Sequence, residues 1–209
     1  MNSIERVQAA IDFRPKDRIP VLPQLFGYTA SLCGFSLLQY VQSGQIAAKC
    51  QLKSLERFGH DGLFALFDTC VEAEAAGCRL RYKENFYPAV QNHVLNASNH
   101  LSGLRVPDPY KDGRCPQILE MIAILKKEAG INNLVAGCVL GPMSLVGQLM
   151  GLEQALYTAV DFPERFAQIL AYATEVIIAF GSAQIHSGAD LLILFVFLIS
   201  PEVVPVGFF

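Results

Sequence analysis

The stretch Asp61–Asp68, DGLFALFD, carries the strongest fold signal in the chain. Its apolar centre is typical of a strand that is buried on both faces of a parallel sheet. The preceding residues 46–58 have apolar side chains at helical spacing and end at Gly59, a residue that commonly closes a helix. A helix leading into a buried strand predicts a β/α unit, with Asp68 at the carboxyl end of its strand.

The same alternation continues on both sides of this unit. Further strands are expected over Arg18–Pro23, Leu134–Leu140 and Leu191–Ile199. A first helix, with Ser3 as its N-cap, is expected to end before Pro15. Apolar residues at helical spacing predict further helices over residues 116–130, 144–150, 153–160 and 163–186.

The intervening segments have weaker signals. Glu72–Ala76 predicts a short helical turn, and Arg79–Lys83 alternates polar and apolar residues as an exposed strand does. Residues 85–110 are rich in Asn, Pro, Ser and Gly, which predicts irregular surface structure laid over the sheet. A loop with Gly27 and Gly34 is expected after the first strand.

Buried parallel strands joined by helices predict right-handed crossovers. A closed (β/α)8 barrel has eight strands in about 250 residues, whereas these 209 residues supply four. The expected fold class is therefore α/β, the N-terminal part of a (β/α)8 TIM barrel, in a single domain over residues 1–209. An open sheet, or completion of the barrel by a partner chain, is the alternative.

Composition excludes several classes of protein. With 52% hydrophobic and 17% charged residues, the chain can bury a core and is not disordered. A net charge of -3 without any basic cluster predicts no nucleic-acid partner. Charged residues interrupt Met1–Phe13, so no secretory signal is expected, and the apolar run Leu191–Ile199 is shorter than the roughly 20 residues of a membrane span. We expect a cytoplasmic protein without a membrane partner.

The metal-ligating residue types show no ligand spacing. The cysteines form no C-x-x-C pair and no zinc-type Cys/His spacing, so we expect reduced, buried thiols. The histidines are expected to be structural. No metal ligand is therefore predicted among these residues: Cys33, Cys50, Cys70, Cys78, Cys115, Cys138, His60, His93, His100 and His186.

Three stretches, taken together, resemble the uroporphyrinogen decarboxylase superfamily. Lys16–Val21, KDRIPV, is similar to the family's PDR(V/I)PV opening, which follows an entry helix. The stretch Asp61–Cys78 has a strand-end aspartate nine residues before a glycine, as the family does. Gly137–Gly151 resembles the family's GP(F/W)T(L) loop, and Ile199–Glu202, ISPE, adds a fourth similarity. The resemblance implies the amino-terminal part of a TIM barrel.

Within the family, the chain resembles the cobalamin-dependent methyltransferase branch more than the decarboxylases. The decarboxylases have an arginine-rich RQAGRY loop that pairs with the carboxylates of the tetrapyrrole, whereas Pro23–Tyr28, PQLFGY, occupies that place here. Leu and Phe cannot replace bidentate guanidinium pairing. The resemblance therefore implies methyl transfer from a methylated corrinoid protein to a thiol or another acceptor, with uroporphyrinogen decarboxylation as the alternative.

The resemblance also implies cofactors and partners. The methyltransferase branch holds zinc through a His-x-Cys pair and a distant Cys, and zinc lowers the pKa of a thiol. This sequence has no His-x-Cys pair, so no cofactor is expected in this chain, although zinc and a partner-bound corrinoid are expected of a complete family member. A small-molecule substrate and a corrinoid protein are the implied partners, a homo-oligomer is left open, and a catalytically inert barrel fragment is a third hypothesis.

Asp68 is the candidate catalytic residue, because barrel active sites are built at the carboxyl ends of strands. A cap on the following turn is the alternative. Glu72 and Glu74 are expected on a solvated turn, with a position facing the mouth of the barrel as the alternative. Five further residues are expected to contact substrate or to shape the pocket wall: Gln24, Tyr28, Gly141, Pro142 and Gln148. For Gly141 and Pro142, a structural turn is the alternative.

Overall fold

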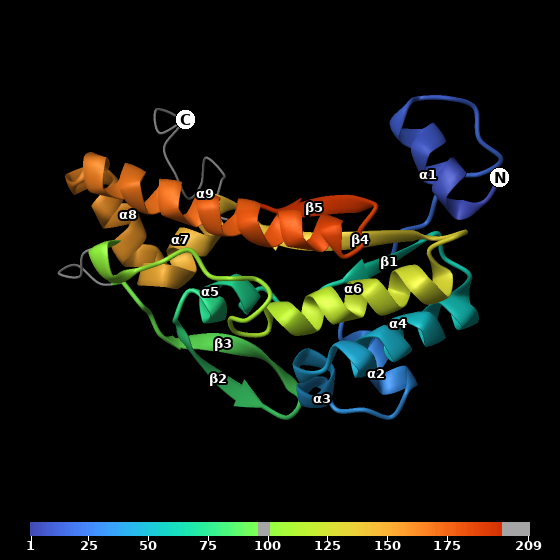
Figure 1. Ribbon diagram of the computed structural model, residues 1–209, viewed down its shortest axis with the longest axis horizontal. Helices are drawn as coiled ribbons and strands as arrows, with labels where there is room; N and C mark the ends of the chain where they lie inside the picture. The colour runs from blue at the N-terminus through green and yellow to red at the C-terminus, as the bar shows by residue number, and fades with distance from the viewer. Residues whose placement is uncertain (96–100, 198–209) are drawn as a thin grey trace.

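The computed structural model describes residues 1–95 and 101–197. Its main sheet has three parallel strands in the order β1 (Gly62–Ala65), β4 (Leu134–Leu140) and β5 (Leu191–Phe195). In Figure 1, α4, α6 and α9 run alongside the strands, while α1 lies at one end of the molecule and α7 and α8 lie at the other. The helices in chain order are α1 (Ser3–Ile11), α2 (Tyr28–Leu32), α3 (Leu37–Gln42), α4 (Gly44–Phe58), α5 (Val71–Ala75), α6 (Cys115–Ala129), α7 (Pro142–Met150), α8 (Leu152–Asp161) and α9 (Pro163–His186), and a 3-10 helix covers Leu101–Gly103.

The two faces of the sheet pack against different partners. Leu63 and Val135 belong to the main core, which the sheet shares with α4, α6 and α9. Phe64 and Ala136 face the other side, in a smaller apolar cluster that includes Val7 of α1. Both faces are apolar because a parallel strand covered on both sides has no solvated face. The described strands form a parallel sheet that does not close into a barrel, as both the predicted partial barrel and the open-sheet alternative require.

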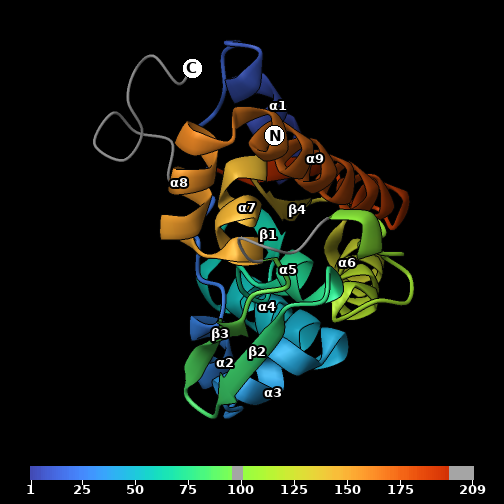
Figure 2. The same ribbon diagram turned by 90° about the vertical axis from the view of Figure 1, so that its left-hand side faces the viewer.

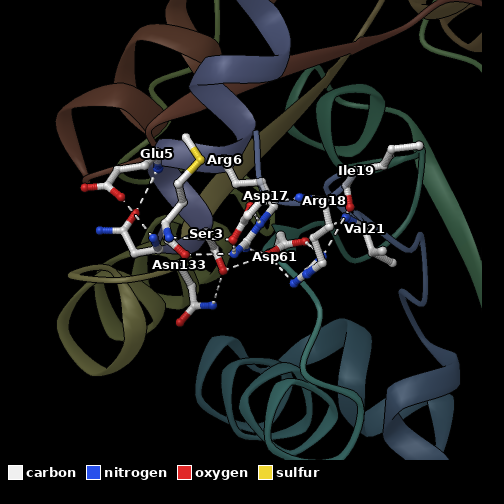
Figure 3. Close-up of polar contacts among 11 residues, drawn as sticks. Ser3, Glu5, Arg6, Asp17, Arg18, Ile19, Val21, Asp61 and Asn133 are labelled. Atoms are coloured by element: carbon white, nitrogen blue, oxygen red, sulfur yellow. Dashed lines mark hydrogen bonds and ion pairs between the residues drawn. The ribbon is translucent and has the colours of Figure 1, made fainter. Parts of the chain in front are cut away.

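The predicted first strand, Arg18–Pro23, is not a strand in the structure. Its main chain makes one bond toward β1, from the Asp61 amide to the Val21 carbonyl at 2.8 Å. The Val21 amide donates instead to the Asp61 carboxylate, also at 2.8 Å, and Pro20 and Pro23 have no amide hydrogen for a ladder. The segment is held by side chains, as Figure 3 shows around Asp61.

The excursion expected over residues 85–110 contains a strand that the sequence analysis missed. β2 (Arg79–Lys83) pairs antiparallel with β3 (Phe86–Asn92), so the predicted exposed strand is one arm of a hairpin. Pro88 argued against a strand for the second arm, because proline is tolerated only in edge strands or at bulges. Figure 2 shows this hairpin beside α2 and α3.

Several helix ends differ from the predictions. Asn2, not Ser3, caps α1, because Asn2 and Glu5 form a capping box, while the Ser3 hydroxyl donates to Asp61 at 2.9 Å. The predicted loop around Gly27 and Gly34 contains α2 and α3. Residues 198 and 199 of the predicted fourth strand, and the ISPE motif that begins at Ile199, lie outside the described residues.

α9 is long and apolar enough to cross a membrane when only length and composition are considered. However, 44% of its most apolar window is buried inside the protein. It packs against α6, α7, α8 and β4, as the core helix of a globular domain does.

β1 and β4 separate toward their carboxyl ends, where the side chains of Gln184 and Glu72 bond to the main chain of β4 in place of β1. Paired residues run only from Gly62 with Leu134 to Ala65 with Gly137. Beyond this point, the Gln184 side chain of α9 accepts from the Cys138 amide and donates to the Cys138 carbonyl, both at 2.9 Å. The two strands therefore separate without leaving the main chain of β4 unsatisfied.

Replacing Gln184 by Leu should lower the free energy of unfolding by about 2 kcal/mol or more, because the buried amide and carbonyl of Cys138 would both lose their partner. Gln184 is fully buried, so water cannot take its place. Urea unfolding followed by circular dichroism measures the change. Gln168→Leu on the exposed side of α9 is the matched control, and an equal loss in both variants would contradict the argument.

Candidate active site

A pocket of about 430 Å³ lies where the carboxyl ends of β1 and β5 meet the loop before α2. This is the end of the strands at which barrel enzymes place their active sites, and the volume lies within the roughly 300–1,000 Å³ of small-molecule sites. Tyr87 of β3 closes one side. The full lining is Gln24, Phe26, Leu66, Phe67, Asp68, Thr69, Tyr87, Phe195 and Phe197.

Aromatic rings form most of the pocket wall and hold each other in place. The Phe26 ring meets the Phe195 ring edge to face at 6.0 Å, and Phe195 stacks on Phe197 at 6.2 Å. The Ser144 hydroxyl of α7 donates to the Phe197 carbonyl at 2.9 Å and accepts from the Phe197 amide at 2.8 Å. The Tyr87 hydroxyl accepts from the Gly27 amide at 2.9 Å, so both ends of the wall are tied to the scaffold.

Asp68 is the one acidic residue of the lining, and a buried arginine fixes it. The Arg114 guanidinium donates to both carboxylate oxygens, at 2.5 Å and 3.1 Å. The Cys70 amide donates to Oδ1 of Asp68 at 2.8 Å, which also fulfils the predicted capping role. Since a carboxylate has about four acceptor positions, Oδ2 keeps acceptor capacity toward a ligand.

Four of the five N–H groups of Arg114 are bonded within the protein. Its Nε donates to Glu74 at 2.6 Å and its Nη1 donates to the Val41 carbonyl at 3.0 Å. The guanidinium also lies over the Tyr82 ring at 5.4 Å. Burial would lower the pKa of Arg114, but hydrogen bonds and charge interactions with Asp68 and Glu74 outweigh it and raise that pKa.

Glu72 and Glu74 are not on a solvated turn, which corrects the prediction. Glu72 is 3% exposed and accepts from the Leu140 amide at 2.9 Å, in the gap between β1 and β4. Burial raises the pKa of Glu72 to about 7. Glu74 is half-buried and accepts from Arg114 and from the Tyr82 hydroxyl. Their contacts with Leu140 and Arg114 come from the tertiary fold, and a short helical turn in the sequence does not reveal them.

The native chain should lose stability as the pH rises and Glu72 ionises. Glu72→Gln, which cannot ionise, should not show this loss. The folded pKa lies above the ordinary 4.5, so the folded state keeps its proton longer. The stabilisation by protonated Glu72 is present below about pH 4.5 and is lost as the pH rises through about 7. From about pH 5 to about pH 8, the free energy of unfolding of Glu72→Gln should rise by about 2–3 kcal/mol relative to that of the native chain.

Urea midpoints at the two pH values measure this difference. Glu175→Gln on the exposed face of α9 is the control and should follow the native pH profile. A Glu72→Gln variant with the native profile would show that Glu72 does not titrate in this range.

The structure brings two of the six predicted site residues into the pocket lining. Gln24 and Asp68 line it, whereas Tyr28 begins α2 with an exposed side chain and is not part of the lining. Gly141 lies against Val196, since a Cβ there would stand 3.2 Å from the Val196 side chain. It therefore allows the chain after β5 to approach closely.

Pro142 and Gln148 support the pocket from α7. Pro142 starts this helix, where a missing amide hydrogen costs nothing. The Gln148 amide group donates to the Thr69 carbonyl at 2.8 Å, so it positions a lining residue, and its buried Oε1 has no partner among the described residues.

Sequence analysis missed Arg114, Tyr87 and the aromatic pair Phe195 and Phe197. Arg114 stands directly before α6, and no local pattern distinguishes a buried ion-pair partner from a surface arginine. The aromatic pair was visible as part of an apolar run but was assigned to a strand interior. The strand ends at Phe195, and the continuous apolar run in the sequence does not mark that end.

The described residues do not fit a zinc ion. No group of three His, Cys, Asp or Glu side chains among them is arranged to hold a metal. Burial raises the pKa of the Cys70 and Cys138 thiols to about 12, whereas zinc is bound by thiolates. The cysteines are free thiols, and all except the half-buried Cys33 are buried, as predicted.

Known proteins resemble the chain in both sequence and structure. A methylcobamide:CoM methyltransferase of Methanosarcina barkeri is 26% identical over 192 residues, which cover 90% of this chain and 56% of that protein. A methylated-thiol--coenzyme M methyltransferase of Methanosarcina mazei is 27% identical over 199 residues, with 93% and 53% covered. A uroporphyrinogen decarboxylase of Xanthomonas oryzae pv. oryzae is 26% identical over 206 residues, with 91% and 57% covered. The chain thus spans about half the length of these relatives.

A solved methyltransferase from Methanosarcina mazei has the same fold, with a TM-score of 0.91 and 24% identity. The superposition covers 100% of this chain and 63% of that protein. The sequence pattern described as Uroporphyrinogen decarboxylase (URO-D) matches residues 2–209. This match over nearly the whole length shows that the chain belongs to the uroporphyrinogen decarboxylase family.

Proposed function

We propose that the chain provides the amino-terminal half of a corrinoid-linked methyltransferase and that its pocket binds the methyl-bearing small molecule. The observation that carries the proposal is the pocket lining, which contains five aromatic side chains and no lysine or arginine. A tetrapyrrole with many carboxylates needs guanidinium or ammonium partners. Arg114, which contacts the lining residue Asp68, already pairs with Asp68 and Glu74. Methyl transfer is therefore favoured over decarboxylation.

The chain's own residues would bind and orient the substrate and exclude water. The aromatic wall supplies apolar contact, and Gln24 and Asp68 supply polar contacts at one side. Because Asp68 is locked by two bonds from Arg114, it is positioned before the substrate arrives, which lowers the cost of ordering it.

Zinc and corrinoid chemistry would require residues or partners beyond those described. A zinc ion, where present in the whole enzyme, would lower the pKa of an acceptor thiol. Since the described residues contain no metal-holding group, we propose that these 209 residues alone do not bind zinc stoichiometrically and do not transfer a methyl group. The corrinoid would come on a partner protein that docks at the mouth of the pocket.

Two calorimetric titrations of the purified chain test the proposal. Ethyl methyl sulfide, a small neutral methyl thioether, should bind with saturation, while uroporphyrin, an octacarboxylate, should not bind. Tight uroporphyrin binding would overturn the proposal in favour of decarboxylation. A parallel zinc titration should show no stoichiometric site, and tight one-to-one zinc binding would contradict the assignment of the metal ligands to another part of the enzyme.

A further inference from the structure

We propose that the pocket recognises a methylated onium group, a quaternary ammonium or a sulfonium, as the head of its small-molecule ligand. The inference deepens the proposed function, and rests on it only in taking this pocket as the substrate site. The juxtaposition that carries it is an aromatic wall beside a fixed carboxylate, in a lining without basic residues.

The aromatic rings provide the binding surface for such a cation. Phe26, Phe67, Tyr87, Phe195 and Phe197 all line the pocket. The face of an aromatic ring carries negative electrostatic potential, so a cation within about 6 Å of its centre is attracted, and cages of several rings are the common site for quaternary ammonium ligands. A methylated onium also has an apolar surface, which these rings can cover without leaving a polar group unsatisfied.

The rings are held in place before a ligand arrives. Ser144 fixes the main chain of Phe197 through two hydrogen bonds, and Phe195 packs between Phe26 and Phe197. A site that is already ordered avoids part of the entropic cost of binding. Phe67 contributes less than the others, because the Arg114 guanidinium already lies 6.0 Å from its ring centre.

The charges around the pocket floor favour a cation over an anion. Asp68 and Glu74 carry two negative charges against the single positive charge of Arg114, and both carboxylates lie within one hydrogen-bonded network. Glu72, with a pKa of about 7, adds partial negative charge at neutral pH. At the low effective dielectric constant of a half-enclosed site, this excess stabilises a bound cation and repels an anion.

Choline and its neutral isostere 3,3-dimethylbutan-1-ol provide a matched pair of probes, because they differ in the charged nitrogen and hardly in shape. Isothermal titration of the full 209-residue chain should give a dissociation constant about tenfold lower for choline. Trimethylsulfonium and tetramethylammonium are titrated in the same way, and the tighter of the two identifies sulfur or nitrogen as the preferred centre. Equal affinity for choline and its isostere, or no binding of any of the three cations, would overturn the inference.

Phe197→Leu should weaken choline binding about fivefold, because it removes one ring of the wall. Phe162→Leu, which changes an exposed phenylalanine at the start of α9, is the control and should bind as the native chain does. Circular dichroism checks that both variants fold, and the comparison of choline with its isostere on the native chain needs no variant. If choline and its isostere bind equally while uroporphyrin does not bind, the onium inference fails and the proposed function stands.

Discussion

Arg114→Ala should lower the free energy of unfolding by about 3–5 kcal/mol, because it leaves a buried carboxylate without its counter-charge. Asp68 is 5% exposed and receives both of its guanidinium bonds from Arg114. The Val41 carbonyl and Glu74 lose a donor at the same time. Urea unfolding at neutral pH, followed by circular dichroism, measures the change.

An exposed ion pair supplies the control for this experiment. Arg105 pairs with Asp112 at 2.7 Å with its own side chain 71% exposed, so Arg105→Ala should lower the free energy of unfolding far less than Arg114→Ala does. A double variant, Arg114→Met with Asp68→Asn, should recover part of the loss, because the buried Asp68 charge is removed together with its partner and only the half-buried Glu74 loses its counter-charge. Similar losses in Arg114→Ala and Arg105→Ala would show that burial does not govern the strength of the Asp68 pair.

The main sheet and the long helices were predictable because the apolar residues that they bury form recognisable local patterns in the sequence. All seven residues of β4 are buried, and a continuous apolar run is the direct sequence signature of such a strand. α4 could also be located from its end, where Gly59 adopts the left-handed conformation with φ of 62°, as glycine allows at little cost.

The elements that were missed depend on contacts between distant parts of the chain. The segment Arg18–Pro23 has the composition of a strand, but the Asp61 side chain takes the Val21 amide that a ladder would use. β3 contains Pro88 and mostly exposed residues, so only its pairing with β2 identifies it. Neither contact can be read from periodicity.

The candidate site also contains residues that the sequence predicted and residues that only the tertiary fold reveals. Asp68 and Gln24 were predicted because they follow strand-like segments, and both line the pocket. Arg114 pairs with Asp68 across 46 positions of sequence, and Glu72 is buried because α5 lies against the end of β4. A motif indicates which strand end carries chemistry, whereas the partners that set charge and position come from the tertiary fold.

Asp61→Asn should lower the free energy of unfolding by about 3–5 kcal/mol, because this fully buried carboxylate joins the entry segment to β1. Arg6 donates to its Oδ1 at 2.5 Å, and Arg18 donates to both oxygens at 2.6 Å and 2.9 Å. Ser3 and the Val21 amide complete the shell, and Figure 3 shows these donors converging on Asp61. Every partner is a donor, so an asparagine would turn its own amide hydrogens toward one of them and weaken the shell further.

The pH dependence of stability separates this charge effect from a loss of packing. Burial would raise the pKa of Asp61, but the bonds from Arg18, Val21, Ser3 and Arg6 outweigh it and lower that pKa to about 2. The carboxylate's contribution is therefore present above its ordinary pKa of 3.8 and is lost as the pH falls toward about 2. Asp61→Asn should lose less stability than the native chain over this window, while Asp161→Asn, at an exposed position at the end of α8, should follow the native profile. If Asp61→Asn kept the native acid dependence, the donors around Asp61 would be satisfied without its charge, and the entry segment would be held by apolar packing alone.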